Sequence, residues 1–356
     1  MNEHRVRRAV VAIGDLPSTG HVPAQPAERL TVPSALTGTA DAYERVAAHL
    51  ADFAEILVVY PEWDAAPARR LLPVVRGLLD TDRVAELGLR LPPLAFSLVA
   101  DLLAHSARYM PLGLLARVSE RLEREVAAGA RMGSVTRLAN VPAGLRQHVR
   151  SYVPGSGFVA WAAPVPRVDA VNRRTGTLDP PEPVPDGQVH LLVARRDGEF
   201  PGLRDRLVEA FRPDKVLDVA PQPLGARYWG TRRHAEFVAF STAPSAFRAL
   251  VQGERFWHCP WCRRPTASEI CPSCRMFQTD PPHQNQSWPP APPDPAPGRE
   301  AAPAARDGAA VPLGDSATPI LTSAVRTTVR TPIALPPAGT AAAHSSGAPD
   351  DPARSA

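Results

Sequence analysis

All four cysteines of this chain lie within sixteen residues, and their spacing restricts how the segment around them can fold. They form two C-x-x-C turns, Cys259-Pro260-Trp261-Cys262 and Cys271-Pro272-Ser273-Cys274, with eight residues between them. Each turn points two sulfur atoms at one spot, and two such turns joined by a short hairpin make a tetrahedral cage of four sulfurs. We therefore expect Cys259, Cys262, Cys271 and Cys274 to bind a structural Zn²⁺, with no open position for a catalytic water.

The two knuckles resemble the bacterial zinc-ribbon pattern of paired C-P-x-C turns over residues 257–276. The resemblance implies a metal module and no particular activity. The sequence departs from the pattern at Arg263 and Arg275, where glycine often follows the second cysteine. Two alternatives stay open: a pair of redox dithiols or disulfides, and His258 replacing one cysteine as a ligand.

Residues 1–140 alternate between helical and strand patterns. Apolar residues recur at helical spacing in 39–54, 65–79, 94–109 and 112–128. A strand is expected at 84–91, and Ile56-Leu57-Val58-Val59-Tyr60 is a continuous apolar run, typical of a strand buried on both faces. This alternation predicts an α/β domain with parallel strands.

The rest of the chain divides into four further parts. Residues 141–187 form a linker-like strip rich in glycine and proline, with one strand expected at 158–163. Residues 188–253 show a β-α-β-β-α order, which predicts an α+β, ferredoxin-like sandwich. Residues 254–280 form the zinc ribbon. Residues 281–356 contain 16 of the chain's 42 prolines, a composition that predicts a disordered Pro/Ala-rich tail.

Charge and apolar patterning exclude several classes of protein. Lys215 is the only lysine beside 39 arginines and has no glycines near it, which excludes a P-loop. No segment has the length and apolarity of a membrane span, so we expect no membrane partner. No segment resembles an export signal either, so we expect a cytoplasmic protein. Cytoplasmic thiols are kept reduced, which favours metal ligation by the cysteines over disulfides.

Two clusters of arginines and aromatic residues are candidates for binding a partner. Four thiolates and Zn²⁺ sum to −2, and nearby arginines could either balance that charge or form a basic surface. The stretch 227–234 mixes cations with aromatic rings, as single-strand binders do, although a hairpin turn with half-buried rings is the plainer interpretation. The candidate partner-binding residues are Arg227, Tyr228, Trp229, Arg232, Arg233, Arg263, Arg264 and Arg275.

Weaker signals point to two other places. Glu62 and Asp64 follow the strand at 56–60, where α/β sheets often bind ligands, but acids there are more often helix caps. Arg131 and Arg137 flank Met132-Gly133-Ser134, which could form an anion nest or a helix C-cap. Neither place assembles a nucleophile, a base and an oxyanion site, so we assign no catalytic residue.

The sequence therefore predicts an intracellular, non-enzymatic zinc-ribbon protein that acts as a binding or scaffold subunit for a protein partner. Two alternatives remain: a nucleic-acid binder that uses the ribbon and the Arg227–His234 stretch, and an enzyme with a site near Glu62 and Asp64.

Overall fold

The structure is a computed structural model of the chain, and its description covers residues 7–22, 26–32, 39–153, 155–171, 177–196, 198–243, 249–250, 252–278 and 286–287. The tail predicted at 281–356 lies outside these residues, apart from the two residues of one short strand. The same is true of most of the helix expected at 244–251.

The first sheet has four parallel strands in the order β2-β1-β3-β4. The strands are β1 (Arg8–Ile13), β2 (Glu28–Leu30), β3 (Glu55–Pro61) and β4 (Val84–Leu89). Strand β3 occupies the middle of the sheet, and Ile56, Leu57, Val58 and Val59 are completely buried. The prediction of a strand covered on both faces is confirmed, because consecutive side chains of β3 belong to two different apolar cores.

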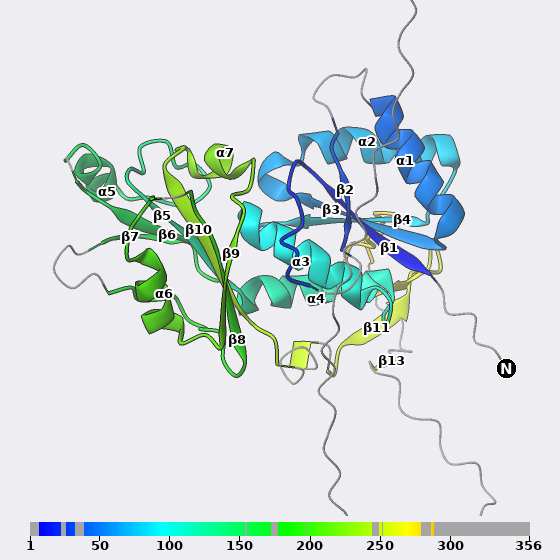
Figure 1. Cartoon of the computed structure of the whole chain (residues 1–356). Helices are drawn as coiled ribbons and strands as arrows, with labels where there is room; N and C mark the ends of the chain where they lie inside the picture. The colour runs from blue at the N-terminus through cyan, green and yellow to red at the C-terminus, as the bar shows by residue number, and fades with distance from the viewer. Residues whose placement is uncertain are drawn as a thin grey trace, which may run out of the picture. The chain divides into compact units, whose positions relative to one another are not determined.

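Helices cover both faces of this sheet. Helices α1 (Thr39–Asp52) and α2 (Ala66–Leu79) pack on one face, and α3 (Pro93–Ser106) and α4 (Leu112–Glu125) pack on the other. Figure 1 shows α1 and α2 above the sheet and α3 and α4 below it. The α/β class predicted for the N-terminal part is therefore confirmed.

Helix α3 is buried on nearly every side because a second sheet lies against it. It contacts β1 of the first sheet and β10 of the second, and one apolar core includes residues of both sheets. This position explains why its sequence is apolar all round, as expected for a helix at the centre of a protein. Figure 1 shows α3 between β1 of the first sheet and the green strands of the second.

The second sheet has six strands in the order β7-β6-β5-β10-β8-β9. All neighbours are antiparallel except β8 and β9, which are parallel and joined through α6 (Leu203–Phe211). The strands are β5 (Ala127–Met132), β6 (Phe158–Ala163), β7 (Arg167–Ala170), β8 (Val189–Ala194), β9 (Lys215–Val219) and β10 (His234–Ser241). Two short helices, α5 (Leu145–Arg150) and α7 (Gly225–Trp229), complete this part. The sheet is larger than the sandwich expected for 188–253, because β5, β6 and β7 precede that range.

Strand β5 corrects one expectation, since a helix was predicted through residue 128. Its sequence, Ala-Ala-Gly-Ala-Arg-Met, lacks the branched and aromatic residues that indicate a strand. Small residues are required there, because a Cβ at Gly129 would collide with the Phe237 ring and the carbonyl of Ala160. The strand expected at 158–163 is confirmed as β6.

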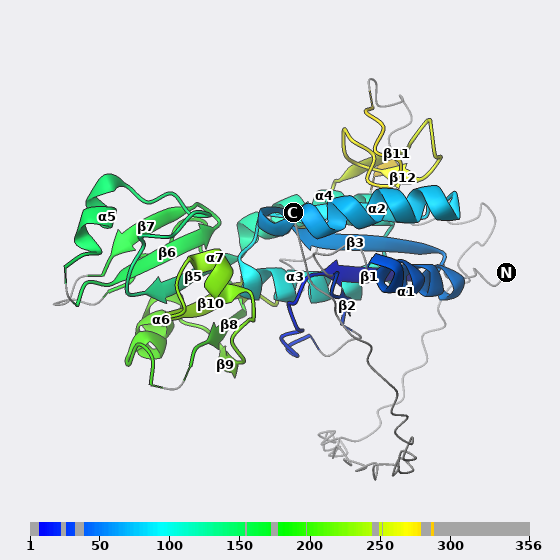
Figure 2. The same cartoon turned by 90° about the horizontal axis from the view of Figure 1, so that it is seen from above.

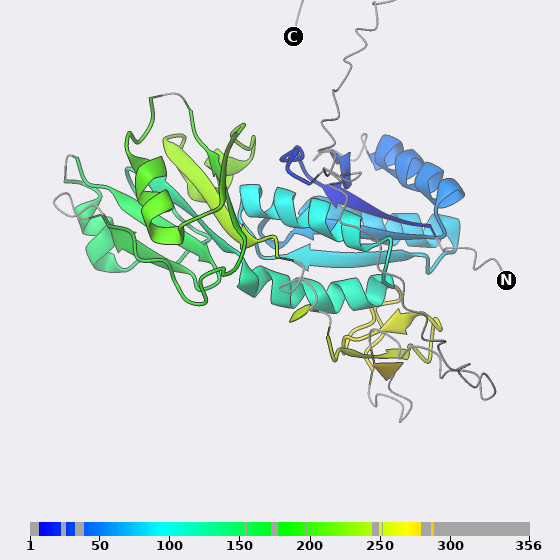
Figure 3. The same cartoon turned by 60° about the horizontal axis from the view of Figure 1, so that its bottom comes forward.

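The ribbon packs on the first sheet's helices. Its hairpin joins β11 (Arg255–His258) to β12 (Pro265–Thr266), and β13 (Gln286–Ser287) pairs with β11. Thr266 bridges to Gly113 of α4, where a Cβ would collide with the carbonyl of Pro265. Figures 2 and 3 show the ribbon beside α4. Among the residues that the structure describes, no helix is long and apolar enough to cross a membrane.

Candidate functional site

The four cysteines predicted as metal ligands lie together. Their sulfur atoms are all within 4.8 Å of one another, and the pairs Cys259–Cys274 and Cys262–Cys271 are 3.6 Å apart. Zinc–sulfur bonds of about 2.3 Å in a tetrahedron separate the sulfurs by about 3.8 Å, so the cage fits a metal ion of this kind. The described group contains only the cysteines, and the exposed His258 is not part of it.

The cysteines of the two knuckles differ in how readily they ionise. Burial raises the pKa of the Cys259 thiol, but hydrogen bonds from the backbone N–H groups of Cys262 and Trp261 lower it to about 7. Gln278 donates a hydrogen bond from Nε2 to Cys259 Sγ at 3.5 Å. Burial, followed by the neighbouring thiols, raises the pKa of Cys274 to about 11. Four crowded thiols therefore need a cation before all of them can ionise.

Two arginines predicted to bind a partner instead fasten the ribbon to the α/β domain. Arg264 pairs with Glu55, and at 2.9 Å with Asp82. Arg275 pairs with Glu86 at 3.0 Å. Glu86 also accepts a salt bridge from Arg76, and its backbone N–H donates to the carbonyl of Pro272. Because their charges are neutralised within the chain, Arg264 and Arg275 do not form a basic partner surface.

Arg263 is exposed and has a positive φ of 62°, and Arg275 has a φ of 63°. Each N–H donates back to the carbonyl of the first cysteine in its knuckle at 2.9 Å. This left-handed conformation is the one that glycine adopts without strain, which explains why the pattern often has glycine there.

The aromatic residues of the Arg227–His234 stretch are buried. Tyr228 and Trp229 are 3% and 0% exposed, so neither ring is available to stack on a base. The Tyr228 ring meets Trp63 edge-on, with 5.2 Å between centroids. Burial, followed by Glu236, raises the pKa of Tyr228. The interpretation with half-buried rings was therefore closer to the structure than the interpretation as a stacking surface. The stretch begins with a short helix, α7, where a hairpin turn was expected.

The arginines of this stretch separate from one another. Arg227 makes two hydrogen bonds of 2.9 Å with the carboxylate of Asp64. Arg232 is exposed, and Arg233 lies beside a pocket that also contains Arg131. The predicted cluster is therefore not one surface.

The carboxyl edge of the first sheet holds Glu62 and Asp64 in a single 3₁₀ turn (Glu62–Asp64). Asp64 is paired with Arg227. Glu62 lies against Gly88 and lines a cleft of about 940 Å³. Helix α4 and the ribbon also line this cleft, through residues such as Glu120, Trp257 and Arg275. Four glutamates and three arginines line it, so the cleft has no strong net charge.

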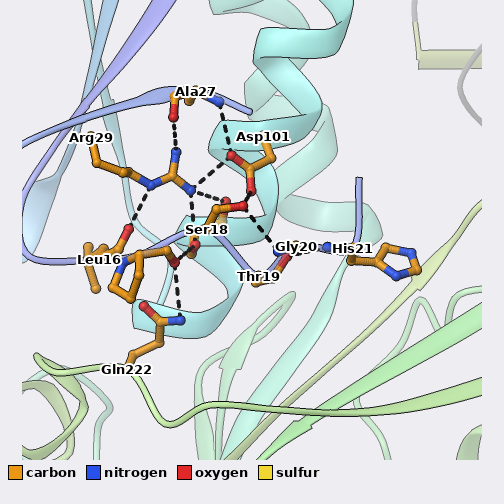
Figure 4. A network of polar contacts seen from close by, with 11 residues as sticks. Leu16, Ser18, Thr19, Gly20, His21, Ala27, Arg29, Asp101 and Gln222 are labelled. Carbon is orange, nitrogen blue, oxygen red and sulfur yellow. Dashed lines mark hydrogen bonds and ion pairs between the residues drawn. The ribbon is translucent and has the colours of Figure 1, made fainter. Parts of the chain in front are cut away.

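A buried carboxylate holds the loop that follows β1 (Figure 4). Asp101 of α3 is completely buried and accepts hydrogen bonds from Ser18 Oγ at 2.6 Å and from the Ala27 N–H at 3.1 Å. Arg29 forms a salt bridge with it at 2.9 Å. These contacts tie the segment between β1 and β2 to α3, which gives Asp101 a structural role.

Helix α5 carries an apolar surface that the sequence analysis missed. Leu145, Val149, Tyr152 and Val153 are 81%, 61%, 79% and 56% exposed, and we call them the α5 surface. Residues 126–168 contain five arginines and no acidic residue. Two features of the sequence indicate this surface: the lack of acids over 126–168, and the apolar pair Leu145 and Val149, four residues apart. It was hidden because this part was interpreted as a linker.

Neither protein families nor curated proteins match this sequence. Solved structures do match. A DegV family protein from Corynebacterium glutamicum has a TM-score of 0.48 and 11% identity, over 67% of this chain and 98% of that one. A DegV family protein from Thermus thermophilus, titled for fatty acid binding, has a TM-score of 0.43 and 13% identity, over 66% and 99%. A Thermotoga maritima protein, titled for a fatty acid binding function, has a TM-score of 0.46 and 8% identity, over 66% and 99%.

These findings correct the predicted function. Several of the similar structures are of proteins described as binding fatty acids or lipid, a class of ligand that the predicted function does not include. The residues chosen for a protein or nucleic-acid partner are paired within the chain, buried or dispersed. The description of this chain as a zinc-ribbon scaffold for a protein partner, with nucleic acid as the alternative partner, is therefore wrong.

Proposed function

We propose that this chain binds lipid, and that the α5 surface is where it contacts an anionic lipid surface. The observation that carries the proposal is the inverted polarity of α5. Its Gln147 points inward and donates to the carbonyl of Val168 at 3.3 Å, while Leu145 and Val149 point to solvent. A helix at the surface of a folded domain normally has the opposite arrangement.

The composition of the surface favours lipid over water. Leucine, valine and tyrosine side chains enter the boundary between headgroups and acyl chains, and tyrosine is enriched there. Arg146 and Arg150 are exposed on the same helix and have no acidic partner among the described residues. Each arginine near an anionic bilayer contributes about 1 kcal/mol of attraction.

The charge of the neighbouring chain fits the same occupant. The 43 residues from 126 to 168 carry five arginines and no acid, so nothing in this segment repels an anionic headgroup. An exposed apolar patch with basic residues is typical of a membrane contact site. The earlier expectation of no membrane partner rested only on the lack of a spanning segment, which surface binding does not require.

Vesicle co-sedimentation of the full chain tests the proposal. We expect binding to vesicles of phosphatidylcholine with phosphatidylglycerol and much weaker binding to phosphatidylcholine alone. The variant Leu145→Ser with Val149→Ser removes the apolar contact. Leu78→Ser is the matched control, because Leu78 is 67% exposed on α2, away from the surface.

Equal binding by the double variant and the control would overturn the proposal, as would a failure to bind anionic vesicles. Binding to a protein partner through the same residues, with no vesicle binding, would also overturn it. A further arm adds a free long-chain fatty acid, the ligand that several titles of similar structures name.

We also propose that the cysteine cluster holds Zn²⁺ as a structural ion, which makes residues 257–276 a zinc ribbon. The donor set supports this, since four thiolates are the ligands of closed zinc sites. Thiols in that state belong in a reducing compartment such as the cytoplasm. Elemental analysis of the purified chain should give one zinc per chain. Two disulfides in place of metal would contradict it.

A further inference from the structure

A pocket on the second sheet brings three arginines together. Arg131 extends from β5, Arg206 from α6, and Arg233 from the residue before β10. All three line a cavity of about 260 Å³. None of them has an ion-pair partner among the residues that the structure describes, and no described residue lining the pocket is acidic.

Arg131 is the most constrained of the three. Its Nη1 donates to the carbonyl of Met132 at 2.7 Å and to that of Phe158 at 3.0 Å, which fixes the plane of the guanidinium. The group lies directly on Gly157, where any Cβ would collide with it. Within the described part of the chain, Nε and Nη2 have no acceptor.

An aromatic ring holds two of the arginines in place. The guanidinium carbons of Arg131 and Arg233 lie 5.3 and 5.7 Å from the centroid of the Phe200 ring, within the range of a cation–π contact. Phe200 itself has a φ of 49°, which is a strained conformation for a residue with a side chain. The ring of Phe200 therefore contacts both cations from a strained backbone position.

Among the residues that the structure describes, no acid forms an ion pair with these three arginines. Burial, and then the charges of Arg206 and Arg233, lower the pKa of Arg131 to about 10. Gathering like charges in a partly buried place is unfavourable unless an opposite charge offsets them. Guanidinium groups bind carboxylate and phosphate oxygens through paired, charge-assisted hydrogen bonds.

The rest of the pocket indicates what carries the anion. Val171, Leu178 and Leu203 supply apolar walls, and Phe200 supplies an aromatic one. The volume of about 260 Å³ accommodates an oxyanion together with a few carbon atoms. We infer that this arginine pocket binds the oxyanion group of a small ligand with a short apolar body, with Arg131, Arg206 and Arg233 as its donors. This site is separate from the α5 surface and does not depend on it.

Isothermal titration calorimetry of the full chain tests the site with two probes, inorganic phosphate and hexanoate, and with acetate as the shorter carboxylate for comparison. We expect one saturable site per chain, with hexanoate binding more tightly than acetate because of the apolar walls. Arg233→Gln should weaken binding about ten- to hundredfold, since a hydrogen bond to a charged group is lost. Arg232→Gln is the matched control, because Arg232 is exposed and does not line the pocket.

A second variant protects the test against misfolding. Arg206→Gln lies on the partly exposed side of α6 and should weaken binding by a similar factor. Equal affinities for Arg233→Gln and Arg232→Gln would overturn the inference, and so would the absence of saturable binding up to about 10 mM of both probes. Binding of the anion only when it is presented on vesicles would likewise overturn the inference, because the pocket would then recognise a lipid headgroup and not a small free ligand. The variant Leu145→Ser with Val149→Ser should leave the affinity for free hexanoate unchanged, which separates this site from the proposed lipid contact.

Discussion

Two groups of arginines in this chain carry the same charge and lie in opposite surroundings. In the ribbon, Arg264 and Arg275 each meet a carboxylate of the first sheet or of the turn before β4. On the second sheet, Arg131, Arg206 and Arg233 line one pocket, and the first and third of them lie over the ring of Phe200. The first group fastens two parts of the chain together, and the second leaves a positive pocket open.

The difference shows that an arginine's function is set by the acids that the fold brings to it. Glu55 is 209 residues from Arg264 in the sequence, so no local pattern could reveal that pair. The segment around Arg131 has no acid for 43 residues, so a lack of neutralisation could be read locally. The lack of acids around Arg131 is therefore visible in the sequence, whereas the partners of Arg264 are not.

Removing the metal should lower stability the most, and the loss should fall on the ribbon, which contains Arg264 and Arg275. Cys271→Ala takes away one of the two completely buried ligands. A structural zinc contributes on the order of 10 kcal/mol to a unit of this size, so the ribbon should unfold. Hydrogen exchange should show loss of protection over 255–278, with the second sheet unchanged. Loss of protection across the second sheet as well would contradict the independence of the two regions.

Breaking the ion pairs of one ribbon arginine should lower the free energy of unfolding less than removing the metal. Arg264→Met removes the contacts to Glu55 and Asp82, while Glu55 keeps its salt bridge to Arg8 at 2.9 Å. The pair is partly exposed, and we expect a loss of about 2 kcal/mol in the free energy of unfolding. Urea denaturation measures it. Arg263→Met, at an exposed position with no described ion pair, is the control and should change stability by less than about 0.5 kcal/mol.

The same substitution in the pocket should act in the other direction. Arg131→Met removes a partly buried cation that no described acid balances, and two hydrogen bonds with it. Replacing such a charge by an apolar side chain is neutral or stabilising, and we expect a gain of about 1 kcal/mol in buffer without phosphate or carboxylate. Urea denaturation in chloride measures it. A loss of more than about 2 kcal/mol would show that Arg131 is neutralised within the chain.

The sequence predicted those parts of the molecule whose signal is local. Strand β3 is a continuous apolar run, and the four cysteines have the spacing of a cage, so both were found from a few residues. Strand β5 was missed because its Ala-Ala-Gly-Ala segment is chosen to fit under Phe237 rather than for strand propensity. Its partners come from residues 158–163 and 234–241, far along the chain.

The candidate sites divide in the same way. Tyr228 and Trp229 looked like exposed stacking residues, because aromatic side chains between arginines are typical of such a surface. They are buried because Trp63 and the core of the second sheet cover them, which depends on tertiary packing alone. The α5 surface had a local signal, and only the interpretation of its segment as a linker hid it.

The smallest expected effect compares the two knuckles of the ribbon. Arg263 and Arg275 have nearly the same left-handed φ, 62° and 63°, but only Arg275 has a described carboxylate partner, Glu86. Arg263→Gly relieves the strain and should raise stability by about 0.5–1 kcal/mol. Arg275→Gly relieves the same strain but loses a partly exposed pair of similar worth, so its net change should be near zero.

Urea denaturation of the zinc-loaded chain measures both glycine variants. The difference between them isolates the contribution of the Arg275–Glu86 pair, because the conformational gain is common to both. A gain of the same size in both variants would show that this pair does not help to hold the ribbon. Arg264 would then be the ribbon arginine that fastens the ribbon to the first sheet, through its contacts to Glu55 and Asp82.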